Sequence, residues 1–580
     1  MHKVLGQIRW MIVERLFPGL TSFPFTMLEA ALLLVVVLLV WLWPAHAQTV
    51  CRRIAGWFQP IFARPNLSLA VIVVGVMVMH LGIALVRPPR EPLVTDEFSY
   101  LLAADTFTHG RLANPPHPLR IFFETPHVNQ TPTYASMYPP GQGLILAVGT
   151  LLFGHPIAGQ WLASAVLTGL IYWALRGYLP SSWALLGAGL CAMRIATFSC
   201  WANSYYMGTP SAIGGALVIG ALPRITRRRS AASAVALGAG FVILANTRPF
   251  EGFLLSIGAF IFLSKEILRS KGEGWRMFRR ISLPLLLTVI PGAIGTAYYN
   301  FRVNGNPFLF GYQINMARHG LAVFPWQSTH AEVVLPQAIL RAFYDSQHAV
   351  FLNALTPHGF FLKLIDGFGK FWRFYIGPVM SLAAVGLVFT LRDRRMTAPW
   401  FAVASLVPAV LLNAFNAPHY VAPGTAAFYV LLVQSLRHLR CVRSWRFGFQ
   451  TAAVIPVVAA VMFSFRLAAE PLRTEWFKEE PSPSWCMCYR RNTDRAVVKR
   501  QLSAQPGKHL AIVRYESSHN SYVGWVYNEA DIDSARIVWA HDLGKEKNLD
   551  LLRNYHDRTV WLIEVNSESA KSVAVSRSEE

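Results

Sequence analysis

The chain has 580 residues, of which 53% are hydrophobic and 14% charged, and its formal net charge is +22. Soluble proteins carry about 25% charged residues, so this composition argues against a soluble enzyme and indicates a membrane protein. The positive charge does not indicate a nucleic-acid-binding protein. Its Lys and Arg residues stand in short runs between apolar segments, as expected of cytoplasmic membrane loops.

Apolar segments separated by turn-forming and basic residues predict about twelve membrane spans. The predicted spans lie near residues 28–44, 67–86, 158–175, 181–198, 207–223, 231–247, 250–264, 281–299, 374–391, 398–416, 420–436 and 449–466. The predicted fold class is therefore an all-α polytopic membrane protein, with one smaller region of different character at its end.

Basic residues divide the predicted loops into two sides. Runs at 227–229 and 437–446 alternate with loops at 199–206 and 417–419 that contain no Lys or Arg. Short basic loops stay in the cytoplasm, so the chain is expected to lie in the inner membrane with its long loops outside. This requires the short apolar run 139–154 to lie on the outer surface as an interfacial helix. The orientation of the first 65 residues stays open.

Three regions follow from this reading. Residues 1–66 carry one extra span, residues 67–467 form the membrane domain with outer loops 87–157 and 300–373, and residues 468–580 form a small outward α/β domain. In the last region, runs rich in Val, Ile, Tyr and Trp predict strands. These strands are expected at 510–514, 522–527, 536–540 and 559–565, with a helix near 549–555.

The strongest local signal is Thr-Asp-Glu-Phe-Ser-Tyr at 95–100, directly after the second predicted span. Thr95 is a residue that can cap a helix, and Asp96 and Tyr100 would then share one helix face. Two acids in a first turn also complement the helix dipole, which is an alternative without chemistry. Their position at the mouth of a membrane bundle favours a chemical role.

Asp96, Glu97, Tyr100 and the outer turn Tyr138-Pro139-Pro140-Gly141 resemble the GT-C superfamily of membrane glycosyltransferases. The protein O-mannosyltransferase and aminoarabinose-transferase branches share this arrangement, and the resemblance covers residues 67–436. Tyr138 stands where a phosphate-binding Lys often precedes the Pro pair. The chain also has an extra span at its start.

The resemblance implies an inverting transfer of a sugar from a polyprenyl-phosphate donor to an acceptor at the outer membrane face. Asp96 would take the proton of the acceptor hydroxyl, and Glu97 would position the acceptor or act on Asp96 through its like charge. Tyr100 and Tyr138 are expected to contact substrate. No cofactor is implied, and a divalent metal is possible but not indicated, since His117, Glu124 and His127 match no metal-binding spacing.

Candidates for the donor phosphate site stand at the outer ends of predicted spans. Arg194 lies inside a span, where a charged residue is costly and therefore a candidate for function, although it could also be an anchor. Arg248 and Glu251 form either a substrate contact or an ion pair in a turn. His419 and Tyr420 stand at a junction without Lys or Arg, where a structural role is the alternative.

Two other classes of protein fit a polytopic chain. A transporter or lipid flippase would place ionisable residues near the membrane midplane in broken helices, whereas here the acids gather in the first outer loop. A non-catalytic membrane scaffold would leave the pairing of the acidic motif with the Tyr-Pro-Pro turn unexplained. The sequence does not identify the sugar, the acceptor (lipid, glycan or protein) or the role of the last domain.

Overall fold

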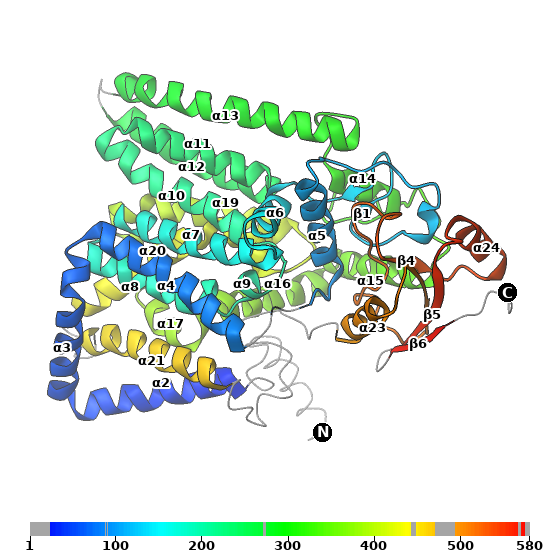
Figure 1. Ribbon diagram of the computed structural model, residues 1–580. Coiled ribbons are helices and arrows are strands. Elements are labelled where there is room, and N and C mark those ends of the chain that lie inside the picture. The colour runs from blue at the N-terminus through cyan, green and yellow to red at the C-terminus, as the bar shows by residue number, and fades with distance from the viewer. Residues whose placement is uncertain are drawn as a thin grey trace.

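The computed structural model describes residues 24–86, 89, 91–270, 274–441, 448–469, 493–566 and 570–574. Figure 1 shows a bundle of long helices with a small sheet-containing domain packed at one end. Residues 1–23 of the predicted region 1–66 and residues 470–492 of the predicted region 468–580 lie outside the described residues.

A helix occupies each of the twelve predicted segments. These helices are α2 (Pro24–Leu42), α4 (Pro65–Val86), α7 (Pro156–Arg176), α8 (Ser181–Cys191), α10 (Thr209–Arg228), α11 (Ala231–Ala245), α12 (Pro249–Arg269), α13 (Gly274–Asn304), α17 (Gly377–Ala384) with α18 (Leu387–Leu391), α19 (Thr397–Leu412), α20 (Thr425–Cys441) and α21 (Gly448–Ala469). Within the described residues, four helices are long and apolar enough to cross a membrane, or five if a bent pair counts as one span. The others are shorter, broken or more polar, so length and composition by themselves do not establish twelve crossings.

One helix of the bundle was not predicted. No element was predicted between the spans 28–44 and 67–86, but α3 (Pro44–Phe62) begins after Trp43 and bends by 107° from α2. Arg52, Arg53 and Trp57 on α3 are exposed. A helix with exposed basic and aromatic residues is suited to the membrane interface, which a search for continuous apolar runs does not detect.

The two long loops fold into short elements at the end of the bundle that carries the sheet domain. The first loop contains α5 (Thr95–Thr108), η1 (Arg120–Phe122), the two-stranded ribbon of β1 (Val128–Asn129) and β2 (Ala135–Ser136), and α6 (Gly141–Phe153). Helix α6 occupies the predicted interfacial segment and leaves Leu144, Leu151 and Leu152 exposed. The second loop contains α14 (Gly311–His319), α15 (Ala338–Leu355) and α16 (Pro357–Phe371).

The last region is a small α/β domain with four strands in the order β4-β3-β5-β6. Strand β3 (His509–Tyr515) pairs parallel with β4 (Ile537–His541) and β5 (Thr559–Val565), and β6 (Ala570–Ala574) is antiparallel to β5. Helices α23 (Thr493–Ala504) and α24 (Lys545–Asn554) belong to the same domain.

The strand predicted at 522–527 is wrong. This segment makes one isolated bridge, from Val523 to Val94 in the first outer loop. Its aromatic side chains pack between the two domains, as the ring of Tyr527 stacks on Phe98 with 4.1 Å between ring centroids. Aromatic composition favours a strand locally, but the segment buries its rings against the membrane domain without forming a ladder.

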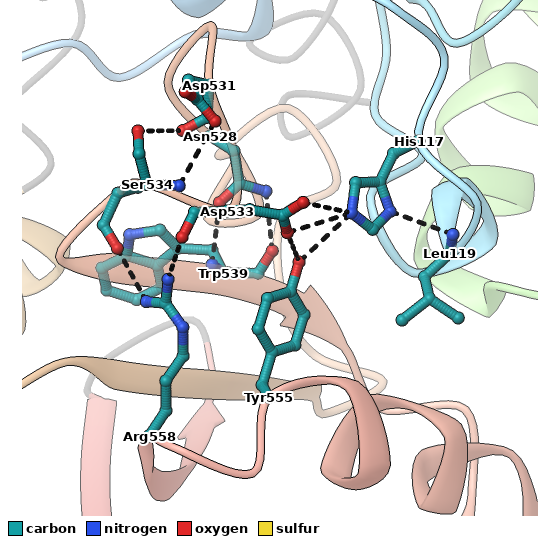
Figure 2. Close-up of polar contacts among 10 residues, drawn as sticks. His117, Leu119, Asn528, Asp531, Asp533, Ser534, Trp539, Tyr555 and Arg558 are labelled. Carbon is teal, nitrogen blue, oxygen red and sulfur yellow. Dashed lines mark hydrogen bonds and ion pairs between the residues drawn. The ribbon is translucent and has the colours of Figure 1, made fainter.

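A polar cluster holds the sheet domain on the first outer loop (Figure 2). His117 Nε2 lies 3.1 Å from Asp533 Oδ1, and the Tyr555 hydroxyl donates to the same oxygen at 2.6 Å. The amide of Leu119 donates to His117 Nδ1 at 2.9 Å. His541 Nε2 lies 2.8 Å from the carbonyl oxygen of Glu124. The last domain is thereby joined to the loop that carries the acidic motif.

Candidate active site

A cavity of about 360 Å³ lies where the first outer loop, the start of α12 and the segment before α20 meet. Most of the predicted site residues line it. These are Asp96, Glu97, Tyr138, Arg248, Glu251, His419 and Tyr420. Residues from distant parts of the chain, from Asp96 to Tyr420, thus share one cavity, which also receives Tyr522 from the last domain.

Asp96 stands at the start of α5 and is held by Tyr138. The Tyr138 hydroxyl donates to Asp96 Oδ1, and the Tyr138 ring stacks on Tyr100 with 4.5 Å between centroids. Tyr100 is buried behind Tyr138 and supports it without lining the cavity. Burial raises the pKa of both tyrosines well above the ordinary value, so both hydroxyls keep their protons.

Glu97 lines the cavity, but its carboxylate is engaged by the backbone. One oxygen accepts from the amides of Leu93 at 2.9 Å and Val94 at 3.3 Å, and the other accepts from the amide of Tyr205 at 3.2 Å. Burial raises the pKa of Glu97, against the opposing effect of these three amide donors. Glu97 therefore holds the backbone segments that shape the site. To hold the acceptor, its carboxylate would have to give up hydrogen bonds from these backbone amides.

The helix cap differs from the prediction. Val94 is the residue before the first turn of α5, and Thr95 lies inside the helix. The expected capping role of the Thr95 side chain is therefore wrong. Glu97 reaches back to the amide of Val94, which leaves the Thr95 hydroxyl free to lie 3.0 Å from His127 Nδ1.

Arg248 is the N-cap residue of α12 and brings a positive charge to the cavity. Its guanidinium carbon lies 4.7 Å from the centre of the Tyr420 ring, and its Nη1 lies 3.8 Å from Glu251 Oε1. The Nε atom is buried and has no hydrogen-bond partner. Among the described lining residues, Arg248 is the one Lys or Arg. The guanidinium can donate charge-assisted hydrogen bonds to an anion.

His419 belongs to η5 (Pro418–Gly424) and lies near Arg248, the N-cap residue of α12. Its ring is 5.0 Å from Tyr206 and 4.6 Å from Tyr420, centroid to centroid. Burial and the nearby charge of Arg248 hold the pKa of His419 well below its ordinary value, so the ring is neutral. Tyr206 also lines the cavity.

Arg194 does not line the cavity, so its predicted place in the substrate site is not supported. Its Nη1 lies 3.5 Å from Glu29 Oε1, and its Nε donates to the carbonyl oxygen of Phe374 at 2.9 Å. The Arg373 carbonyl oxygen accepts from Nη2. Arg194 instead ties α2 to the broken segment before α17, a pairing that sequence alone could not reveal because Glu29 is 165 positions away.

The three residues considered as metal ligands separate in the structure. Glu124 pairs with Arg318, His117 joins Asp533, and His127 lies 3.6 Å from Asp96 Oδ2. Within the described part of the chain, no three His, Cys, Asp or Glu side chains converge in a way that could hold a metal ion. His127 is the cavity residue whose place beside Asp96 the sequence analysis missed.

No protein-family model matches the chain, and no curated protein is similar to it in sequence. The structure is similar to that of ArnT from Cupriavidus metallidurans bound to undecaprenyl phosphate, with 13% identity and a TM-score of 0.48 over 88% of this chain and 93% of that chain. It is also similar to the Archaeoglobus fulgidus oligosaccharyltransferase tethered to an acceptor peptide, with 12% identity and a TM-score of 0.46 over 88% of this chain and 69% of that chain. At these identities no residue role passes from them to this chain.

Proposed function

We propose that this chain is a glycosyltransferase that moves a sugar from polyprenyl phosphate to an acceptor at the outer face of the inner membrane. The observation that carries the proposal is the content of the cavity. A carboxylate on α5, Asp96, and a guanidinium at the start of α12, Arg248, enter it from different elements. Arg248 keeps a buried donor without a partner. Such a pair suits a reaction that removes a proton and releases a phosphate.

Asp96 is the general base in this mechanism. With Oδ1 held by Tyr138, its other oxygen is left to accept the proton of the acceptor hydroxyl as that oxygen attacks the anomeric carbon. A positioned base contributes about 10²–10⁴ in rate. The bond from the anomeric carbon to the phosphate breaks on the opposite side, so the configuration inverts. No second carboxylate is assigned as a nucleophile.

Arg248 holds the leaving phosphate in this mechanism. Its unpartnered Nε and the start of α12 both favour an anion, since amide groups at a helix N-terminus carry partial positive charge. Tyr420 fixes the guanidinium plane from one face. His419 and Tyr206 form the neighbouring wall and, being protonated or neutral, add no negative charge.

The proposal includes the membrane arrangement. The twelve helical segments would span the bilayer, residues 1–66, 67–467 and 468–580 would be its three regions, and the cavity and last domain would lie outside the cytoplasm. The exposed leucines of α6 would face lipid beside the cavity.

A transfer assay with the full-length protein in lipid nanodiscs tests this function. Undecaprenyl phosphate carrying a radiolabelled hexose or pentose would be incubated with envelope lipid extract, and label would be followed into acceptor. We expect transfer by the wild type and loss of transfer in Asp96→Asn, with Asp366→Asn, an acid outside the cavity, unaffected. Passage of intact labelled lipid across the bilayer without transfer would support a flippase, and normal transfer by Asp96→Asn would refute the base assignment.

A further inference from the structure

His127 occupies the cavity wall in an uncommon backbone conformation. Its φ is 65°, and the described part of the chain contains one other non-glycine residue with positive φ, Arg229 at the end of α10. Side chains with a Cβ rarely adopt this region, and where they do the surrounding structure must hold them there. The position of His127 is therefore a feature that the fold maintains at a cost.

Two hydrogen bonds hold the backbone of His127. The Ser99 hydroxyl donates to its carbonyl oxygen at 2.6 Å, and the amide of Met137 donates to the same oxygen at 3.1 Å. Ser99 belongs to α5 and Met137 follows β2, so the histidine is tied both to the helix that carries Asp96 and to the strand that leads to Tyr138. Its ring is thereby aimed at the carboxylate.

The ring of His127 lies beside Asp96 Oδ2, the carboxylate oxygen to which Tyr138 does not donate. His127 Nδ1 lies 3.6 Å from Asp96 Oδ2 and 3.0 Å from the Thr95 hydroxyl. Tyr138 and Phe343 pack against the ring, with centroids at 5.7 and 5.6 Å. With Nδ1 unprotonated, its single lone pair accepts from the Thr95 hydroxyl. Nδ1 takes a proton from Asp96 once that hydroxyl has rotated away.

The groups around His127 leave it neutral. Asp96 and Tyr138 face it in the cavity, Phe343 on α15 is uncharged, and His319 on α14 interacts with it electrostatically. Burial lowers the pKa of His127, while the charge of Asp96 opposes that effect. Burial also lowers the pKa of His319 to about 3, so this neighbour is uncharged. The imidazole is thus a free proton acceptor at neutral pH.

We propose that His127 relays the proton that Asp96 takes from the acceptor hydroxyl, an inference that rests on the proposed transferase function. The acceptor oxygen forms its bond to the anomeric carbon and loses its proton to Asp96 Oδ2. The bond from that carbon to the phosphate oxygen breaks, and its electron pair leaves with the phosphate. The proton then passes from Asp96 to His127 Nδ1, and the imidazolium releases its Nε2 proton to water. Exchange with water then moves the remaining ring proton from Nδ1 back to Nε2, which restores the starting tautomer. Asp96 is again a carboxylate for the next turnover.

The pH dependence of His127→Asn tests the relay, because asparagine tolerates positive φ and has no titrating group in this range. We expect kcat to fall on the order of 10²-fold. The KM for undecaprenyl phosphate carrying labelled sugar should be unchanged, and the loss of rate that protonation of His127 causes at acid pH should disappear. His330→Asn, an exposed histidine outside the cavity, is the matched control and should keep the wild-type profile. A His127→Asn enzyme with wild-type kcat and the same acid limb would overturn the relay.

Chemical rescue separates a relay from a packing role. His127→Gly fits the backbone conformation and leaves space for free imidazole beside Asp96. Added imidazole should raise the kcat of His127→Gly at least tenfold. Pyrazole has a similar shape but is a far weaker base, so it should not raise this kcat. Equal rescue by both compounds, or by neither while the variant binds undecaprenyl phosphate normally, would refute the relay. Absence of transfer by the wild type would instead refute the proposed function.

Discussion

Two arginines were expected to compete for the donor phosphate, and their surroundings differ. Arg248 lines the cavity with a buried donor left over, whereas Arg194 is held by a carboxylate and two carbonyl oxygens. A charged side chain away from water keeps its place only with such partners. Arg194 therefore serves the fold, and Arg248 is the candidate for the ligand.

Replacing Arg248 should weaken binding of undecaprenyl phosphate. Arg248→Ala leaves the phosphate without its cation, which should cost about 2–4 kcal/mol of binding free energy. Arg248→Lys keeps the charge but loses the planar fork, so its loss should be smaller. Titration of nanodisc-embedded protein with undecaprenyl phosphate measures the affinity of both variants. Undecaprenol is the uncharged control ligand, and Arg302→Ala is the control variant. Unchanged affinity in Arg248→Ala would transfer the role to His419 and Tyr138.

Replacing Arg194 should affect folding and leave the ligand affinity of the folded fraction unchanged. Arg194→Ala leaves Glu29 as an unpaired buried carboxylate, and breaking such a pair costs about 3–5 kcal/mol. Thermal unfolding in detergent should show a lower midpoint, and Glu29→Gln with Arg194→Ala should recover part of it because no charge is then left alone. An Arg194→Ala protein with wild-type stability and lost undecaprenyl phosphate binding would contradict this assignment.

At the scale of elements, the segment 522–527 links three parts of the site. Val523 bridges to Val94, two residues before Asp96, and Tyr522 lines the cavity. The Tyr522 hydroxyl accepts from Gln347 Nε2 at 2.7 Å and lies 3.1 Å from Ser346 Oγ, both on α15. The segment therefore fixes a part of the cavity wall that α12, the helix of Arg248, does not provide.

Tyr522→Phe should weaken acceptor use selectively. It removes the hydroxyl that α15 engages but keeps the ring against Phe343, so the wall loosens without collapsing. We expect the KM for acceptor to rise severalfold and the affinity for undecaprenyl phosphate to stay constant, since Arg248 lies on other elements. Tyr298→Phe on the exposed face of α13 is the control. A change in donor affinity with constant acceptor KM would place Tyr522 on the donor side instead.

At the scale of the whole molecule, the sheet domain and the first outer loop behave as one unit. Their contact includes the cluster of His117, Asp533 and Tyr555 and the buried ring of His541 against the Glu124 carbonyl oxygen. Aromatic packing of Phe98 and Tyr527 adds an apolar layer beside these polar contacts. Loss of this contact would expose the start of α5 and open the cavity wall.

Acidification should weaken this contact through His541. Burial lowers the pKa of His541 from 6.5 to about 4, so between these pH values the unfolded or undocked chain binds more protons than the native one. Stability is therefore fully present above pH 6.5 and falls as the pH drops toward 4, by on the order of 3 kcal/mol. Limited proteolysis across this pH range measures this loss of stability. The stability of His541→Gln should depend less on pH. Identical slopes in both proteins would exclude His541 as the cause.

The proposed orientation can be tested with single cysteines in a cysteine-free background. Positions 109, 330 and 534 are exposed on the cavity side, and positions 228 and 394 are exposed at the opposite, basic ends of helices. An impermeant thiol reagent on intact cells should label the first three, and the last two should react after permeabilisation, because basic loops stay in the cytoplasm. Labelling of 109 and 228 from the same side would overturn the topology.

The sequence alone determined what depends on local composition. Long apolar runs and the breakers between them located the bundle helices, including α7 and α13, because helix formation in lipid requires only a continuous apolar segment. The acidic motif and Arg248 were likewise found from their place at span ends.

Tertiary structure decided which partners those residues contact. Arg194 pairs with Glu29 outside the site, and the carboxylate of Glu97 accepts from backbone amides. The segment 522–527 contacts the first outer loop and forms no strand ladder. His127 shows the same limit: its place beside Asp96 depends on a positive φ held by Ser99 and Met137, and contacts between distant segments leave no periodic signal in the sequence.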